Sequence, residues 1–123
     1  MSDAESRKWT LAVDCDGVLH SYTTPWSAAH EIPDPPVDGA IEWLNEIHRH
    51  FQIVIHTTRG DQDGGNEAVM TWLRDSGFTG PDLLVTSRKI PALMYVDDRA
   101  YRFEGDNFPT ARQIYEAKPW YKK

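Results

Sequence analysis

Trp9-Thr10-Leu11-Ala12-Val13-Asp14-Cys15-Asp16-Gly17 is the stretch of sequence that decides the fold. It begins as a short apolar run and continues directly into two aspartates and a glycine. A run of this kind is typical of a buried strand in a parallel sheet. We therefore expect a strand over 9–14 whose carboxyl end carries Asp14 and Asp16.

The rest of the chain alternates predicted helices with predicted strands. Helical spacing of apolar residues predicts helices over 39–50, around 69–73 and over 110–118, whereas short apolar runs predict strands over 52–57, 82–86 and 93–97 and a short edge strand over 101–103. This alternation predicts an α/β fold, a three-layer α/β/α sandwich with a central, mainly parallel sheet and helices on both faces.

Composition limits the class of protein. The chain has 123 residues and fits one domain over 1–123, with tails at 1–8 and 119–123 that we expect to be flexible. The single cysteine, Cys15, excludes a disulfide-rich secreted scaffold and fits a reducing compartment. The N-terminus lacks the apolar core of a signal peptide, and no apolar run approaches the roughly 20 residues of a membrane helix. We expect a cytoplasmic protein with no membrane partner.

Polar residues follow three of the predicted strands directly. Asp14 and Asp16 follow the first, 57–59 (Thr-Thr-Arg) the second, and 97–99 (Asp-Asp-Arg) the fourth. The carboxyl ends of parallel strands share one edge of a sheet, where ligands bind in such folds. Clustered carboxylates are costly unless a cation joins them, and oxygen ligands favour Mg²⁺. The sequence predicts a magnesium site there, with Asp14, Asp16, Asp97 and Asp98 as its carboxylates.

Taken alone, each of these segments is more often a turn or solvated surface than a functional site. Their joint position after apolar strands is what favours a site. Gly17 permits a tight turn whose N–H groups approach an anion. Two readings stay open for Arg59 and Arg99, which either bind a substrate phosphate or pair with the acidic residues.

The motifs resemble those of the haloacid-dehalogenase-like (HAD) phosphohydrolases. The first motif of that family, Asp-x-Asp-Gly after an apolar strand, matches 14–17, and the closing acidic pair matches 97–98. The threonine that ends an apolar strand matches Thr57, with Thr58 as its neighbour, and the upstream lysine is best matched by Lys89, with Arg88 as the alternative. These four motifs occur in the family's order and span residues 9–98.

The resemblance implies a role for each matched residue. Asp14 would be the nucleophile that forms an aspartyl-phosphate, and Asp16 the general acid/base whose carbonyl also binds the metal. Thr57 would bind the transferring phosphoryl group, and Lys89 would offset its charge. Asp97 would ligate Mg²⁺, with Asp98 as a direct or water-mediated ligand. An aspartate at the second position is typical of phosphatases within the family, so the resemblance implies a magnesium-dependent phosphomonoester hydrolase.

Many relatives carry a cap domain over the site, but residues 18–37 and 60–88 are too short to hold one. The resemblance therefore implies a capless HAD-like fold with an open site, whose phosphorylated substrate is a small molecule or a macromolecular end. The 18–37 loop holds Tyr22 and Trp26, for which two readings stay open: both stack on a base or sugar of the substrate, or Trp26 packs the loop onto the body. Two other functions remain open: a polynucleotide end-processing phosphatase, which the net charge of −6 disfavours, and a HAD-fold binding or regulatory module with little turnover.

Overall fold

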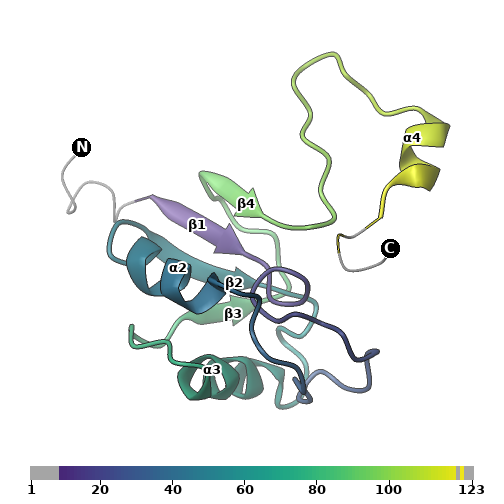
Figure 1. Ribbon diagram of the computed structural model, residues 1–123. Coiled ribbons are helices and arrows are strands. Elements are labelled where there is room, and N and C mark those ends of the chain that lie inside the picture. The colour runs from purple at the N-terminus through teal and green to yellow at the C-terminus, as the bar shows by residue number, and fades with distance from the viewer. Residues whose placement is uncertain (1–8, 119, 121–123) are drawn as a thin grey trace.

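The computed structural model describes residues 9–118 and residue 120. Four strands and three helices follow one another in the predicted order (Figure 1). They are β1 (Thr10–Val13), α2 (Ala40–Ile47), β2 (Gln52–His56), α3 (Gly65–Asp75), β3 (Leu84–Thr86), β4 (Met94–Val96) and α4 (Ala111–Glu116). The α/β class is therefore confirmed.

The four strands form one sheet in the order β3-β2-β1-β4, and every neighbouring pair is parallel. The register places Ala12 of β1 between Val54 of β2 and Tyr95 of β4. The chain moves from β1 to β2 and β3 on one side and returns to β4 on the other. The order of strands thus reverses between β1 and β4, and the carboxyl ends at such a point are where open sheets bind ligands.

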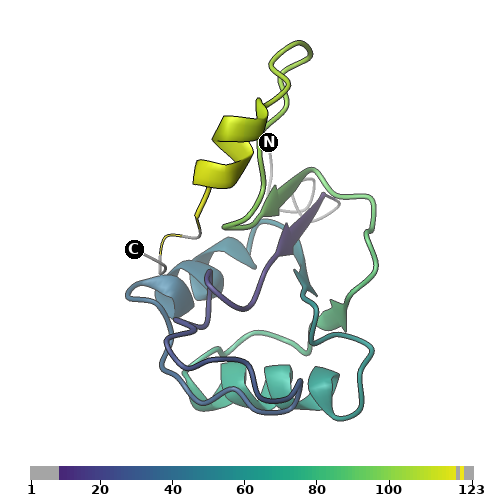
Figure 2. The same cartoon turned by 90° about the vertical axis from the view of Figure 1, so that its right-hand side faces the viewer.

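Helices α2 and α3 lie against the same face of the sheet (Figure 2). The strands turn alternate side chains toward that face, and Val13, Ile55 and Val85 are buried in a single apolar cluster with residues of both helices, including Leu44 and Leu73. This alternation is the expected consequence of the two-residue period of a strand. The second helical layer that the sequence predicted is not seen among the described residues, because α4 lies away from the sheet (Figures 1 and 2).

Residues 17–39 form a loop of turns and isolated bridges that is anchored at several points. His20 pairs in single bridges with Asp16 and with Pro36. The Asp34 carboxylate accepts hydrogen bonds from the backbone N–H (2.8 Å) and the hydroxyl (2.6 Å) of Thr24. The indole N–H of Trp72 in α3 donates to the Asp34 carbonyl at 3.1 Å. These contacts tie the loop to α3 beside the carboxyl edge of the sheet.

The C-terminal segment differs from the prediction. Residues 101–103 were expected to form an edge strand, but they are irregular and pair with no strand in the described part of the chain. Helix α4 begins with a capping box between Thr110 and Gln113, yet it buries none of its residues. Apart from Trp120, whose indole N–H donates to the Gly17 carbonyl, the tails predicted to be flexible lie outside the described residues.

None of the helices among the described residues is long and apolar enough to cross a lipid bilayer.

Gly60 lets the turn after β2 lie directly against the end of β3. A Cβ atom at this position would lie 2.4 Å from the carbonyl carbon of Thr86 and 2.6 Å from the backbone nitrogen of Ser87. Both neighbours are backbone atoms and cannot rotate away. We expect Gly60→Ala to lower the free energy of unfolding by about 1–3 kcal/mol, measured by urea denaturation. A change below about 0.5 kcal/mol would contradict the close approach.

Candidate functional site

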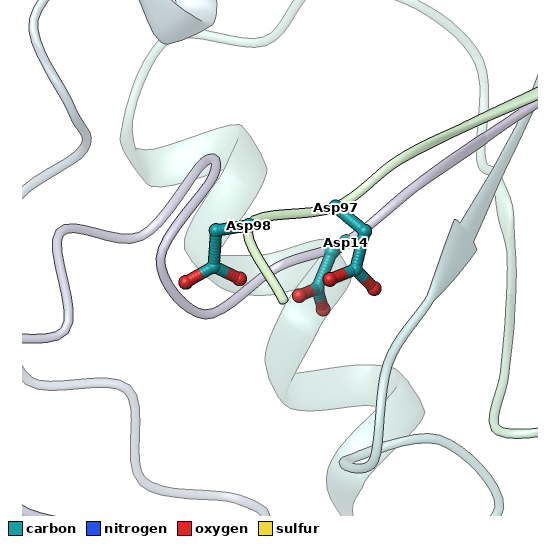
Figure 3. Close-up of side chains that lie close together, drawn as sticks. All are labelled: Asp14, Asp97 and Asp98. Carbon is teal, nitrogen blue, oxygen red and sulfur yellow. The ribbon is translucent and has the colours of Figure 1, made fainter. Parts of the chain in front are cut away.

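Three carboxylates gather where β1 and β4 end. Asp14 follows the last residue of β1, and Asp97 and Asp98 follow the last residue of β4. The backbone N–H of Asp14 donates to the Val96 carbonyl at 2.9 Å, which keeps the two strand ends together. One oxygen of each carboxylate lies within 4.8 Å of one from each of the others (Figure 3). These oxygens are close enough to share one cation.

These carboxylates are electrostatically strained without a cation. Burial, followed by the charge of Asp97, raises the pKa of Asp14 from 3.8 to about 8. Burial also raises the pKa of Asp98, and Asp97 adds to that effect. Both carboxylate oxygens of Asp98 are buried and have no hydrogen-bond partner among the described residues. Buried polar atoms without partners are rare in folded proteins and often mark the position of an ion or a catalytic group.

Asp16 has a different environment although it is only two residues from Asp14. Its carboxylate accepts hydrogen bonds from Nε of Arg59, at 3.1 and 3.0 Å to its two oxygens, and lies 2.8 Å from Nδ1 of His20. Burial alone would raise the pKa of Asp16, but the hydrogen bonds from His20 and Arg59 outweigh it and lower the pKa. Asp16 is therefore held as an anion, while its neighbour Asp14 favours the neutral form.

Arg59 is the buried centre of this arrangement. Its side chain is only 1% exposed. Besides binding Asp16, its Nη1 donates to the carbonyls of Ala28, Ala29 and Glu31 at 2.9, 3.1 and 2.8 Å. Of the two readings left open for Arg59, pairing with an acidic residue is the one seen here. The guanidinium thus joins the first motif to the far part of the 17–39 loop.

The protonation of His20 follows from its two partners. The backbone N–H of Asp34 donates to Nε2 of His20 at 3.0 Å, so this nitrogen carries no proton. Nδ1 is then the protonated nitrogen, and it donates to Asp16. His20 is fully buried, which makes it a fixed link between the loop and the Asp16 carboxylate.

Asp61 fixes the turn after β2. Asp61, whose φ of 63° lies in the left-handed region, accepts hydrogen bonds at one oxygen from the hydroxyl of Thr86 and from the backbone and hydroxyl of Ser87. The bonds from Ser87 and Thr86 lower the pKa of Asp61. The turn after β2 is therefore fastened to the end of β3, which holds Thr57 and Thr58 at the edge of the sheet.

A cavity of about 300 Å³ opens beside the carboxylates. Seven of the residues predicted for the site line it: Asp14, Asp16, Trp26, Thr57, Thr58, Asp97 and Arg99. Tyr22, His56 and Ser87 line it as well. Carboxylates, hydroxyls and an arginine around one small cavity can bind a metal together with an anionic group, and a carboxylate beside such a group can act as a nucleophile.

Four of the predicted residues do not line this cavity: Asp98, Gly17, Arg59 and Lys89. Lys89 is exposed, with its Nζ 6.0 Å from the ring centre of Tyr95, and the alternative Arg88 is exposed as well. Gly17 adopts a φ of 84° and donates its N–H to the His20 carbonyl at 2.8 Å. Among the lining residues, Arg99 is the one lysine or arginine.

Sequence reasoning missed Ser87 and placed His20 and His56 only near the rim of the site. Ser87 had a usable signal because it directly follows β3, as Thr57 follows β2. His56 is the last residue of β2 and faces Tyr95, with ring centres 5.2 Å apart. The contact of His20 with Asp34 could not be predicted, because it depends on how the loop folds back on itself.

The comparisons with known proteins assign no family to this site, since no family model, curated protein or solved structure matches the chain.

Proposed function

We propose that the protein is a magnesium-dependent phosphomonoester hydrolase that works through an aspartyl-phosphate on Asp14. Its fold would be of the capless, HAD-like α/β/α type. The protein would act in the cytoplasm on a phosphorylated substrate. The observation that carries the proposal is the meeting of Asp14, Asp97 and Asp98 at the point where the strand order reverses, beside a cavity. Open parallel sheets place their chemistry at this point.

The donor set fits Mg²⁺. All three groups offer carboxylate oxygens, which hard divalent cations prefer. Within residues 9–118 and 120 the Asp98 oxygens have no hydrogen-bond partner, and the pKa of Asp14 is raised; a cation among the three carboxylates would relieve both. Asp14, Asp97 and Asp98 would hold the ion, and the bound ion would offset negative charge on the phosphoryl group and on its nucleophile.

The reaction divides into two balanced halves. In the first, a carboxylate oxygen of Asp14 bonds to phosphorus as the bond to the leaving oxygen breaks, and that oxygen takes up a proton from solvent water. In the second, water attacks phosphorus as the bond between phosphorus and the Asp14 oxygen breaks, a proton of the water passes to Asp16, and the products are inorganic phosphate and the free Asp14 carboxylate. Asp16 lines the same cavity. Because Arg59 and His20 hold it as an anion, it is better suited to accept the proton of water than to donate one.

Other residues bind the phosphoryl group. Thr57 and Thr58 present hydroxyls at the end of β2, and Arg99 supplies a positive charge at the cavity. Lys89 would have to swing away from Tyr95 to contribute the charge that the family resemblance assigns to it.

The proposal is tested first by phosphate release. Purified protein is incubated with Mg²⁺ and a panel of sugar phosphates, nucleotides, aryl phosphates and 5′-phosphorylated oligonucleotides. Metal-dependent release from any small ester supports the hydrolase. Release from oligonucleotides alone identifies the polynucleotide end-processing alternative. Ligand binding without release identifies a binding or regulatory module.

Metal binding is tested independently of activity. We expect Mg²⁺ at about one hundred times its Kd to stabilise the chelator-treated protein by about 2.7 kcal/mol, or roughly 10 °C in Tm. Asp97→Asn should lose most of this shift because it removes a ligand. Asp75→Asn is the matched control, since Asp75 ends α3 at the opposite edge of the sheet. Equal shifts in both variants would refute the site.

The same metal should control turnover. Chelation should stop phosphate release, and added Mg²⁺ should restore it, whereas Ca²⁺ should restore little. Ca²⁺ takes more ligands at longer distances and would misplace the attacking carboxylate. Full activity in the presence of chelator would contradict the proposed mechanism.

A further inference from the structure

Two aromatic side chains line the candidate cavity although the hydrolysis of a phosphate ester does not require them. Tyr22 and Trp26 line it together with Asp14 and Asp97, and both come from the 17–39 loop. Trp26 is 42% exposed. Large apolar side chains that remain exposed beside a polar site commonly contact a ligand.

The buried side chain of Arg59 packs against the ring of Trp26. The guanidinium carbon of Arg59 lies 4.5 Å from the centre of the Trp26 ring. Arg59 is itself immobilised by Asp16 and by three carbonyls of the loop. A cation held over an indole ring attracts it and fixes its orientation. The exposed surface of the ring is thus a pre-oriented platform.

Tyr22 is held in an unfavourable backbone conformation. Its φ is 57°, in the left-handed region that residues other than glycine rarely adopt. Its neighbours fix it there: the N–H of Ser21 donates to the Pro35 carbonyl, and Thr24 is bonded to Asp34. Strained residues of this kind persist where the surrounding structure holds them, and they cluster at ligand sites.

The remaining residues that line the cavity indicate which chemical groups lie between the phosphate and the ring of the ligand. His56, Thr58 and Ser87 supply polar groups at the same cavity. A ligand with phosphate at one end, a planar ring at the other and hydroxyls between them matches this set. A nucleotide has this composition, because its sugar separates the base from the phosphate. A phosphotyrosine places an apolar ring directly on the phosphate and leaves the polar groups unused.

We propose that Tyr22 and Trp26 form a ring-binding subsite and that the substrate is a nucleoside monophosphate. This inference rests on the proposed phosphatase function. The same chemistry occurs in a free mononucleotide and at the end of a nucleic-acid strand. The cavity of about 300 Å³ and the net charge of −6 favour the free mononucleotide.

The test compares adenosine 5′-monophosphate with ribose 5-phosphate, in which a hydroxyl group takes the place of the base. We expect the wild type to prefer the nucleotide by about ten- to hundredfold in kcat/KM, the range that stacking on one aromatic ring supports. Trp26→Ala should lose this preference because it lowers kcat/KM for the nucleotide much more than for ribose 5-phosphate. Trp26→Phe should retain much of the preference because it keeps an aromatic ring.

Trp9→Ala is the matched control. Trp9 is 45% exposed and precedes β1, at the opposite edge of the sheet from the cavity. The control should keep the full preference for the nucleotide. Equal loss on both substrates in Trp26→Ala, or an unchanged preference, would overturn the subsite.

Calorimetry separates the two proposals. Adenosine 5′-monophosphate is titrated into Asp14→Asn with and without Trp26→Ala. Tighter binding by the protein that retains Trp26 supports the subsite even if no ester is hydrolysed, in which case only the phosphatase fails. Phosphate release without any dependence on the base leaves the phosphatase and removes the subsite. A 5′-phosphorylated oligonucleotide or a phosphotyrosine peptide turned over ten times more efficiently than the mononucleotide would overturn the choice of substrate.

Discussion

Asp14→Asn is expected to reduce phosphate release by about 10³-fold or more, the scale seen when a catalytic nucleophile is removed. The amide has nearly the shape of the carboxyl group but cannot attack phosphorus. It also removes one of the three oxygens within 4.8 Å that would bind the metal. The loss should appear in kcat for every ester in the panel.

The same substitution should stabilise the metal-free protein. Burial and Asp97 raise the pKa of Asp14 to about 8. At neutral pH the unfolded chain prefers this group ionised, so folding must either protonate it or hold an unfavourable charge. Asparagine is uncharged at every pH, so folding of the variant does not incur this cost. We expect a gain of at least about 1 kcal/mol, or roughly 3–5 °C in Tm, measured in chelator.

The combination of lost activity and gained stability separates catalysis from folding. Asp75→Asn, at the exposed end of α3, should change neither quantity. A variant of Asp14 that retains activity would show that another group attacks phosphorus. A variant that melts well below the wild type in chelator would show that the Asp14 carboxylate has a stabilising partner.

The positions of Asp14, Thr57 and Asp97 could be predicted because each follows an apolar strand directly. Parallel pairing then brings the strand ends to one edge, whatever the loops do. Apolar run length and the alternation of helices with strands were sufficient for this part of the site. The short strands β3 and β4 were placed for the same reason, although each is shorter than predicted.

The contacts of Arg59 could not be predicted in the same way. Arg59 and Asp16 are 43 residues apart, and the carbonyls that Arg59 binds lie in a loop without periodicity. The sequence therefore left two roles open for this arginine. Lys89 raises the same difficulty, because β3 ends at Thr86 and the residues after it have no strand period to orient their side chains.

The segment after β4 shows where local patterns mislead. Tyr101 and Phe103 alternate with Arg102 as in a strand, but a strand needs a partner, and none lies beside them among the described residues. The capping box of α4 specifies where that helix begins without specifying what it packs against. Local signals identified this helix, whereas its place relative to the sheet depends on tertiary contacts.

Arg59→Met should be the most destabilising single substitution at the site, at about 3–5 kcal/mol in the free energy of unfolding. Methionine fills a similar volume but provides no donor. The Asp16 carboxylate would lose its charged partner, and three loop carbonyls would lose the hydrogen bonds that they accept from Arg59. Urea denaturation measures the change as a lower midpoint with an unchanged slope.

Arg74→Met is the matched control for this substitution. Arg74 also pairs with an aspartate, Asp82, at 2.7 Å, but the two side chains are 40% and 87% exposed. Exposed ion pairs contribute about 0–1 kcal/mol, so the control should lose no more than about 1 kcal/mol. Similar losses of stability in both variants would show that the buried ion pair of Arg59 contributes no more than an exposed one.

A double variant identifies the source of the cost. If Arg59→Met is harmful because it leaves Asp16 charged and unpaired, then adding Asp16→Asn should recover part of the lost stability. The carbonyls of Ala28, Ala29 and Glu31 lack the Arg59 donor in both variants, so recovery should be incomplete and the loop should stay more sensitive to limited proteolysis than in the wild type. Complete recovery would assign the whole effect to the ion pair, and no recovery would assign it to the anchoring of the loop.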